Sequence, residues 1–132
     1  MLDHVSLGVG DLERSRRFYD AVLRPLGVVR IVDFQQRGSD YGALAGPLGV
    51  EFTITLENDP MPASGMHVCF RAPDRAAVRA FHAAALRSGG RDDGEPGLRP
   101  QYHADYFAAF VLDPDGHRVE VVCHAPQAPT AQ

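Results

Sequence analysis

The sequence predicts an α+β fold in which two βαβββ modules form a concave, partly closed sheet cup. The first observation behind this prediction is an internal repeat, because residues 3–27 align with residues 66–90 at a constant offset of 63. Nine of the 25 aligned positions are identical, whereas chance at ordinary composition would give roughly two. The second observation is that each repeat opens with alternating apolar residues and continues with apolar residues at helical spacing. The identical pairs are His4/His67, Val5/Val68, Asp11/Asp74, Arg16/Arg79, Phe18/Phe81, Ala21/Ala84, Leu23/Leu86, Arg24/Arg87 and Gly27/Gly90.

The first repeat, residues 1–57, is predicted to contain a strand, a helix and three further strands. Residues 3–9 alternate between apolar and other side chains, which is typical of a half-buried strand. Asp11 is a suitable N-cap for the helix that follows, and Gly27 ends that helix. The other expected strands are residues 28–34, 41–46 and 49–57, with Pro47 and Gly49 in the turn before the last of them.

The second repeat, residues 65–125, follows a short linker at 58–64 that is rich in turn-forming residues. Asp74 is expected to begin its helix, as Asp11 does in the first repeat. Residues 92–105 are expected to form a long polar loop, with at most a short strand at its start. The remaining expected elements are strands at 66–72, 106–112 and 117–124, a tight turn at 113–116 and a flexible tail at 126–132, all within one domain spanning 1–132.

Composition and charge narrow the class of protein. The chain has 132 residues, of which 45% are hydrophobic and 23% charged, and its net charge is −4, as is ordinary for a soluble globular protein. It has no basic stripe with interleaved aromatic residues, so we expect no nucleic acid partner. It has neither a bilayer-spanning apolar run nor a secretory signal, so we expect no membrane partner and a cytoplasmic location. Cys69 and Cys123 are expected to be free thiols.

Two histidines and two glutamates occupy equivalent places in the two repeats. Because side chains alternate along a strand, His4 and His67 are predicted to point away from the helices, onto an open face. Glu51 and Glu120 lie between apolar residues in the last strand of each repeat, so we expect them on the same face. Imidazole and carboxylate ligands together suit one divalent ion such as Ni, Zn, Fe, Co or Mn. These four residues are the predicted metal ligands, which leave two positions of an octahedral ion for water or substrate.

Other polar residues are candidates for binding a substrate. Tyr102, His103 and Tyr106 lie in or directly after the long loop, beside the predicted cup, and loops in such places often carry specificity. The alternative is that these three residues only pack within the loop. Arg71 shares the face of His67 and is a candidate for binding an anionic group. The histidines expected at the surface are His82 and His117.

Three motifs carry a resemblance to a known family. They are DHVSLGVGDLERSRRFYDAVL near the start, HVCFRA in the middle and FVLDPDGHRVEVV near the end, and they cover nearly the whole chain. The chain resembles the vicinal oxygen chelate superfamily, which includes glyoxalase I, extradiol dioxygenases, fosfomycin-resistance proteins, methylmalonyl-CoA epimerase and bleomycin-resistance proteins. The resemblance implies a glyoxalase-like fold. It also implies metal ligands at His4, His67 and Glu120, and Glu51 corresponds to the additional carboxylate of glyoxalase I.

Two positions depart from the glyoxalase I pattern. Glyoxalases similar to this chain have an arginine four residues after the first histidine, where this chain has Gly8. They also have an asparagine four residues after the first glutamate, where this chain has Thr55. Since that arginine helps to hold the glutathione carboxylate, the resemblance implies a substrate other than the standard glutathione hemithioacetal.

These features favour a metal-dependent enzyme of the glyoxalase type, a lyase or isomerase. Its small-molecule substrate would chelate the metal through adjacent oxygens, with Glu51 or Glu120 as general base. One alternative is an Fe(II) extradiol-type dioxygenase that uses His4, His67 and Glu120 as ligands. Another is a non-catalytic small-molecule-binding protein of the bleomycin-resistance kind.

A homodimer is the expected assembly. Each module leaves an open sheet edge and an apolar rim, and symmetric pairing is the common way to cover such surfaces. The short linker allows the two modules to pair within one chain or to exchange across the dimer.

Overall fold

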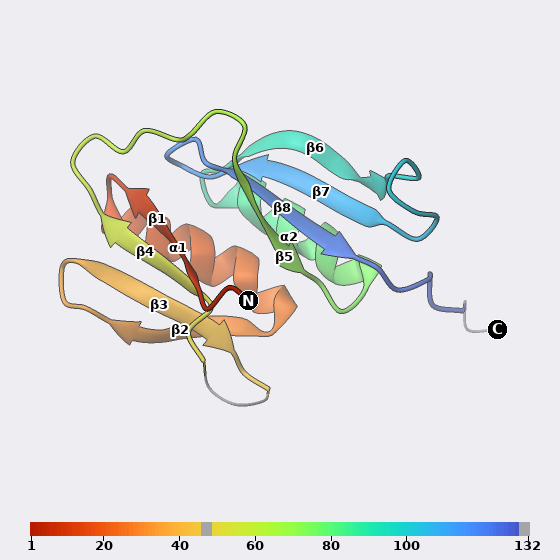
Figure 1. The fold of residues 1–132 in the computed structure, drawn as a ribbon, viewed down its shortest axis with the longest axis horizontal. Helices are drawn as coiled ribbons and strands as arrows, with labels where there is room; N and C mark the ends of the chain where they lie inside the picture. The colour runs from red at the N-terminus through yellow and green to blue at the C-terminus, as the bar shows by residue number, and fades with distance from the viewer. Residues whose placement is uncertain (46–48, 130–132) are drawn as a thin grey trace.

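The computed structural model describes residues 1–45 and 49–129, and it consists of two halves with the same order of elements (Figure 1). The first half contains β1 (Val5–Val9), α1 (Leu12–Leu23), a 3-10 turn (Arg24–Leu26), β2 (Val28–Asp33), β3 (Gly38–Ala43) and β4 (Phe52–Leu56). The second half contains β5 (His67–Arg71), α2 (Arg75–Arg87), β6 (Arg91–Leu98), β7 (Phe107–Leu112) and β8 (Arg118–Cys123). Both halves thus have the predicted order of a strand, a helix and three strands.

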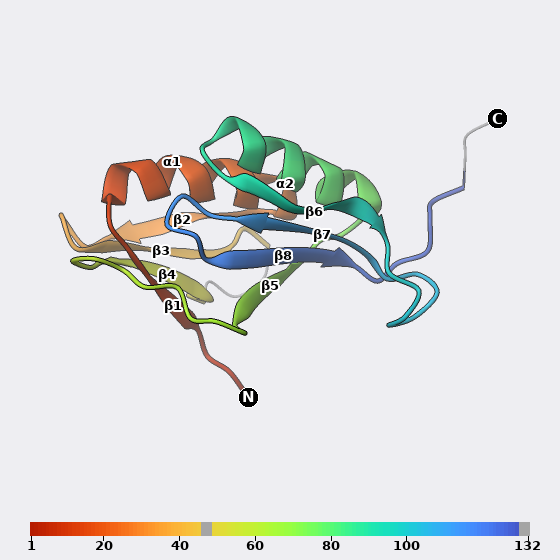
Figure 2. The same cartoon turned by 90° about the horizontal axis from the view of Figure 1, so that it is seen from above.

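Each half forms its own four-stranded mixed sheet. The first sheet has the strand order β1-β4-β3-β2, and the second sheet has the order β5-β8-β7-β6. In each sheet the first strand runs parallel to the last strand of the same half, and the other neighbours are antiparallel. The two helices contact each other and cover one side of both sheets, which leaves the other side open (Figure 2). The predicted α+β fold is confirmed, and the sheets are not closed.

Both helices begin at an aspartate that the repeat places at the same point. The Oδ1 atom of Asp11 accepts a hydrogen bond from the amide of Arg14 at 3.0 Å, and that of Asp74 accepts one from the amide of Ala77 at 2.8 Å. Such caps satisfy amides that lack a partner in the first helical turn, and each stabilises the protein by about 1 kcal/mol. The 3-10 turn after α1 ends at Gly27, whose φ of 75° is left-handed. The predicted N-caps are confirmed.

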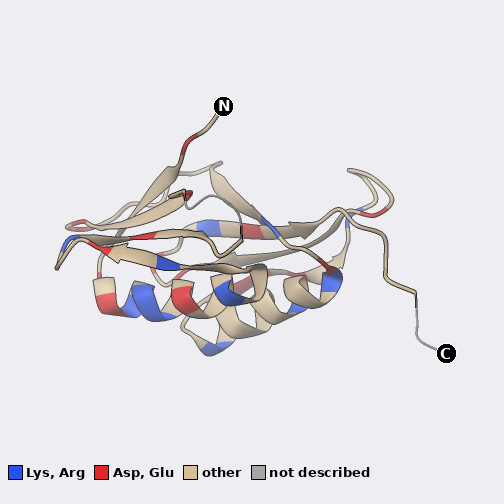
Figure 3. Ribbon diagram, turned by 90° about the horizontal axis from the view of Figure 1, so that it is seen from below, with Lys and Arg blue, Asp and Glu red and all other residues tan. Residues whose placement is uncertain are grey.

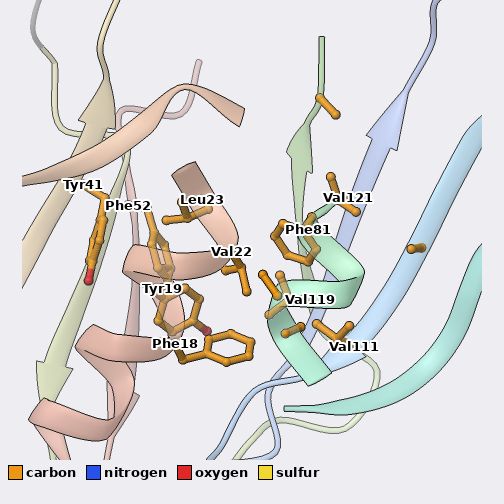
Figure 4. Packing of buried hydrophobic residues seen from close by; sticks show 14 of the residues in the cluster. Phe18, Tyr19, Val22, Leu23, Tyr41, Phe52, Phe81, Val111, Val119 and Val121 are labelled. Atoms are coloured by element: carbon orange, nitrogen blue, oxygen red, sulfur yellow. The ribbon is translucent and has the colours of Figure 1, made fainter. Parts of the chain in front are cut away.

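A cluster of buried apolar residues lies between the helices and the sheets and continues from one half into the other (Figure 4). Tyr19 of α1 packs on Phe52 of β4 with ring centroids 4.8 Å apart. Phe52 also meets Phe70 of β5 edge to face at 5.2 Å, so it joins the two sheets. Phe18 and Phe81, which are equivalent in the repeat, are both fully buried. The amphipathic helices and the inward faces of the strands therefore share one core.

The turn between β7 and β8 fastens the second half to α1. The Tyr19 hydroxyl donates a hydrogen bond to Oδ2 of Asp113 at 2.6 Å, and both side chains are buried. The Oδ1 atom of Asp115 accepts hydrogen bonds from the amide of Gly10 and from Nη2 of Arg14, both at 2.9 Å. Because hydrogen bonds to a buried carboxylate are costly to break, these contacts hold the two halves in one relative position.

Two histidines that the sequence analysis expects at the surface are instead held by partners. His117 is half-buried, and its Nε2 donates to the carbonyl oxygen of Gly8 at 2.7 Å. His82 on α2 is buried, with Nε2 only 2.9 Å from Oδ1 of Asp92. The expectation is wrong for His82, whereas His117 remains partly exposed although it binds a residue 109 positions away.

The second half also departs from the prediction at residues 92–105, where a long loop is expected. Arg91–Leu98 form the strand β6, and the loop is confined to residues 99–106. β6 lies at the edge of the second sheet, where proline is tolerated, and its register to β7 shifts on both sides of Gly94. The acidic, glycine- and proline-rich composition of this irregular edge strand resembles that of a loop, which explains the error. The predicted turn residue Pro47 of the first half lies outside the described residues.

Charged residues of both signs are interspersed over the molecule. Acidic and basic positions both occur along α1, as Figure 3 shows. All 13 basic side chains of the sequence are arginines. In the described part of the chain, no helix has both the length and the apolar character required to cross a membrane.

Removal of the Tyr19 hydroxyl should destabilise the protein. In Tyr19→Phe, the buried Asp113 loses a donor, so the free energy of unfolding at pH 7 should fall by about 1–3 kcal/mol. Burial holds the pKa of Asp113 above its ordinary value of 3.8. The folded protein therefore binds this proton more tightly than the unfolded chain does, and protonation favours the folded state as the pH falls. Since a neutral carboxyl depends less on the lost donor, the loss should be smaller at pH 4.

Urea unfolding at both pH values measures this difference. The matched control is Tyr41→Phe, which removes a hydrogen bond of 2.9 Å to the half-exposed Asp20. Because the carboxylate of Asp20 can form hydrogen bonds with water instead, the free energy of unfolding at pH 7 should fall less in this variant than in Tyr19→Phe. Equal losses in the two variants would contradict the role assigned to Tyr19.

Candidate functional site

His67 and Glu120 meet on the open side of the second sheet. Their strands, β5 and β8, pair in parallel with Cys69 opposite Glu120. His67 lies two residues before Cys69, so the alternation of the strand places both side chains on the same face. The Nε2 atom of His67 lies 3.0 Å from Oε2 of Glu120. Two of the four predicted metal ligands are therefore in direct contact.

Tyr106, directly before β7, binds the other oxygen of Glu120. Its hydroxyl donates to Oε1 of Glu120 at 2.6 Å. Burial, this hydrogen bond and the carboxylate charge all raise the pKa of Tyr106, so the hydroxyl keeps its proton at neutral pH. The Glu120 side chain is only 4% exposed, and a carboxylate so deeply buried requires partners of this kind.

Cys69 lies beside the same carboxylate. Burial, with a further contribution from the nearby Glu120 charge, raises the pKa of the Cys69 thiol to about 12. The thiol is therefore neutral at physiological pH. Cys69 and Cys123 are both free, as the sequence analysis predicts.

A cavity of about 440 Å³ opens beside these side chains. Its wall contains Tyr102 and Tyr106, which the sequence analysis names as substrate-binding candidates. It also contains Phe110 and Arg118, which the sequence analysis does not name. Phe110 pairs with Glu120 across β7 and β8, and Arg118 precedes Glu120 by two residues, so strand alternation was a signal for both. The full lining is His67, Tyr102, Tyr106, Phe110, Arg118 and Glu120.

His103 does not line this cavity but contacts His124, which the sequence analysis does not assign to the site. The Nε2 atom of His103 lies 2.9 Å from Nδ1 of His124, and the amide of Asp105 donates to Nδ1 of His103 at 3.1 Å. Both imidazoles meet the ring of Tyr106 edge to face, with centroid distances of 5.5 and 5.3 Å. His103 thus packs against a residue of the cavity wall.

His4 and Glu51 directly precede β1 and β4, so Glu51 lies just before the strand in which it is expected, and both line a second cavity of about 370 Å³. The amide of Val5 donates to the carbonyl oxygen of Glu51 at 3.1 Å, which holds the two strand ends together. The Nδ1 atom of His4 lies 2.7 Å from Oδ1 of Asp3. Arg71 of β5 lines this cavity rather than the one beside His67. The second predicted ligand pair is therefore open and exposed.

The four predicted metal ligands are divided between these two cavities. Within residues 1–45 and 49–129 of one chain, no three His, Cys, Asp or Glu side chains are grouped so that they could hold one ion. Of the four residues, only His67 and Glu120 are spaced as two ligands of one ion would be. Two ligand atoms that lie about 2.1 Å from an ion, at right angles to each other, are about 3.0 Å apart. This is the distance between Nε2 of His67 and Oε2 of Glu120. The two cavities adjoin, since Cys69 lines the second cavity and lies beside Glu120, which lines the first.

Comparison with known proteins identifies the family. The sequence profile of the glyoxalase/bleomycin resistance protein/dioxygenase superfamily matches residues 1–121. The chain belongs to this superfamily. No curated protein gives a significant match.

Solved structures of superfamily members share the fold. A glyoxalase/bleomycin resistance protein from Albidiferax ferrireducens is 32% identical, with a TM-score of 0.80 over 96% of this chain and 99% of that one. A glyoxalase I mutant from Zea mays is 25% identical, with a TM-score of 0.67, and 93% of this chain matches 46% of the maize chain. A fosfomycin resistance protein from Mesorhizobium loti is 19% identical, with a TM-score of 0.67 over 95% of this chain and 92% of that one.

Cys69 should react slowly with alkylating agents. A cysteine with an ordinary pKa of about 8.5 is partly ionised at pH 8, so a pKa of about 12 should slow alkylation of Cys69 by iodoacetamide about 10³-fold. Glu120→Gln removes the neighbouring charge and should increase the rate. Asp93→Asn, which removes a carboxylate that pairs with Arg118, is the control and should leave the rate unchanged. Peptide mass spectrometry measures each rate, and equal rates in wild type and Glu120→Gln would contradict the assigned contact.

Proposed function

We propose that the protein is a metal-dependent enzyme of the glyoxalase type, a lyase or isomerase acting on a small substrate that chelates through adjacent oxygens. The observation that carries the proposal is the contact of 3.0 Å between His67 and Glu120 beside a cavity of about 440 Å³, in a chain of the glyoxalase superfamily. An imidazole and a carboxylate suit Ni, Zn, Fe, Co or Mn. His4 and Glu51 supply the same two ligand types and are proposed as the remaining ligands.

Glu51 is proposed as the general base of the reaction. When bound, the divalent ion would polarise a substrate oxygen and so lower the pKa of the proton on the adjacent carbon. Both carboxylate oxygens of Glu120 already have partners, His67 and Tyr106. The Glu51 side chain makes no hydrogen bond within the described part of the chain and is exposed, so it is free to take up and return a proton.

The cavity walls support a small, planar substrate that carries an acidic group. Tyr102, Tyr106 and Phe110 present aromatic rings, and Arg118 supplies a guanidinium group at the wall. The standard glutathione hemithioacetal is disfavoured by Gly8, because a Cβ atom there would lie 2.9 Å from Cγ of Glu57. An acidic side chain therefore occupies the place from which glyoxalases extend their arginine toward the glutathione carboxylate.

A homodimer is proposed as the functional unit. The two ligand pairs lie in separate cavities of one chain, and a second copy can bring the His67 pair of one subunit to the His4 pair of the other. The edge strand β2 offers an apolar surface for pairing with a second copy, because Ile31, Val32 and the adjacent Phe34 are exposed apolar residues. The proposed compartment is the cytoplasm, which the two free cysteines favour.

Two variants test the proposed ligands and base. His67→Ala should lose metal, as measured by elemental analysis, because an imidazole ligand is removed. Glu51→Gln should keep part of the metal while turnover falls about 10²- to 10⁴-fold, because an amide cannot take up the proton. Turnover is measured on the metal-loaded protein with a panel of 2-oxoaldehyde–thiol adducts, catechols and acyl-CoA compounds. Glu13→Gln removes an exposed carboxylate of α1 and should change neither quantity.

The results separate the candidate functions. Full activity in Glu51→Gln would remove Glu51 from the site and favour a dioxygenase with three ligands. Wild-type protein without metal, even after incubation with each of the five ions, would overturn the proposal and favour a non-catalytic binding protein.

The proposed dimer predicts a particle of twice 14.4 kDa in light scattering at micromolar concentration. Val32→Glu should produce a monomer, because it buries a charge in the edge-strand interface. Leu86→Glu, which changes an exposed leucine of α2, should leave the mass unchanged. A monomeric wild type would exclude the dimer.

A further inference from the structure

We propose that Tyr106 is a positioning residue that orients the carboxylate of Glu120 for metal binding, and that three neighbouring rings hold Tyr106 in place. These rings, here termed the Tyr106 cage, belong to Tyr102, His103 and His124. The proposal rests on the proposed metal site, since it concerns one of its ligands. It gives Tyr106 a role other than the substrate contact that the sequence analysis expects.

The two oxygens of Glu120 are held by different partners. The Tyr106 hydroxyl donates to Oε1 at 2.6 Å, and Oε2 faces Nε2 of His67 at 3.0 Å. A length of 2.6 Å is typical of hydrogen bonds from a hydroxyl to a carboxylate, which are about twice as strong as hydrogen bonds between neutral groups. The terminal torsion of a glutamate is otherwise soft, with a broad range of angles. The Tyr106 hydroxyl therefore keeps one oxygen occupied and presents the other beside the imidazole.

The cage fixes the ring of Tyr106 on several sides. The ring of Tyr102 lies 4.8 Å away, and the imidazoles of His103 and His124 meet it edge to face. The planes of the two imidazoles are inclined by only 23°. Because the Asp105 amide donates to Nδ1 of His103, the proton of His103 is on Nε2 and is donated to Nδ1 of His124 at 2.9 Å. The cage is thus fixed by hydrogen bonds as well as by packing.

The cage joins a loop to the strand that carries the ligand. Tyr102, His103 and Tyr106 belong to the loop 99–106, whereas His124 directly follows β8. Backbone hydrogen bonds close this loop. The amide of Arg99 donates to the carbonyl oxygen of Tyr106 at 2.7 Å, and the amide of Tyr106 donates to the carbonyl oxygen of His103 at 3.2 Å. The orientation of Glu120 therefore depends on a segment that contributes no metal ligand of its own.

Tyr106→Phe tests the proposal, with Tyr41→Phe as the matched control. Both variants remove one hydroxyl that donates to a carboxylate, but Tyr41 binds Asp20 in the first half. The first measurement is the imidazole 15N chemical shift of His67 in metal-free protein at pH 8, with His67→Ala to assign the signal. In wild type, Oε2 of Glu120 should hold the proton on Nε2. In Tyr106→Phe the shifts should move toward those of a free tautomer mixture, and in Tyr41→Phe they should not.

The second measurement is a Co(II) titration followed by visible absorption. Loss of a hydrogen-bond partner of a metal ligand lowers metal affinity about 10- to 100-fold, so the Co(II) dissociation constant of Tyr106→Phe should rise by that factor. The spectrum should also change, because the freed carboxylate can bind through both oxygens. Tyr41→Phe should match wild type in both respects. His124→Asn, which keeps the hydroxyl but opens the cage, should shift both measurements in the same direction by a smaller amount.

The outcomes distinguish this inference from the proposed function. Unchanged His67 shifts and unchanged Co(II) affinity in Tyr106→Phe would overturn the positioning role while leaving the metal site intact. Wild-type protein that binds no Co(II), but whose His67 shifts still respond to Tyr106→Phe, would overturn the metal-dependent function and support the positioning of Glu120. A His124→Asn variant identical to wild type would overturn the role of the cage.

Discussion

The buried hydrogen bond between Tyr19 and Asp113 is central to the contacts that hold the two halves of the protein against each other. Tyr19 belongs to the first helix and packs on Phe52, whereas Asp113 begins the turn of the last hairpin. The same turn binds the start of the first helix through Asp115. Because the candidate ligands are divided between the halves, any change in this contact would also change their separation.

The two halves repeat in sequence, but they are not equivalent in structure. The offset between matching residues is 63 at Val5 and Val68, but it is 67 at their partners Phe52 and Val119, so Glu51 and Glu120 do not occupy equivalent strand positions. The additional residues lie in β6 and in the loop 99–106, which is longer than the matching connection between β2 and β3. That loop supplies the aromatic residues around Glu120. The second half thus presents a preorganised pair, and the first half presents an exposed pair that can move.

Local patterns in the sequence were sufficient for the elements other than β6 and for one half of the candidate site. The repeated aspartate caps and the alternation of β5 and β8 depend on neighbours in sequence, and the contact between His67 and Glu120 follows from them. Contacts that depend on distant segments were not predictable in this way. His117 and His124 have partners 109 and 21 residues away, and β6 is an irregular strand because it lies at an edge.

The parallel pairing of the first and last strands in each half constrains the order in which the protein can fold. β8 is an inner strand of the second sheet, and it is synthesised after every other strand. Until β8 is made, β5 has no partner strand. The hydrogen bond between Tyr19 and Asp113, which are 94 positions apart, also cannot be stabilised before then. Pairings over such sequence distances form slowly, and unpaired edges favour aggregation. Because Glu120 lies on this strand, a nascent chain can form the contacts of Glu120 with His67 and Tyr106 only in the step that completes its second sheet.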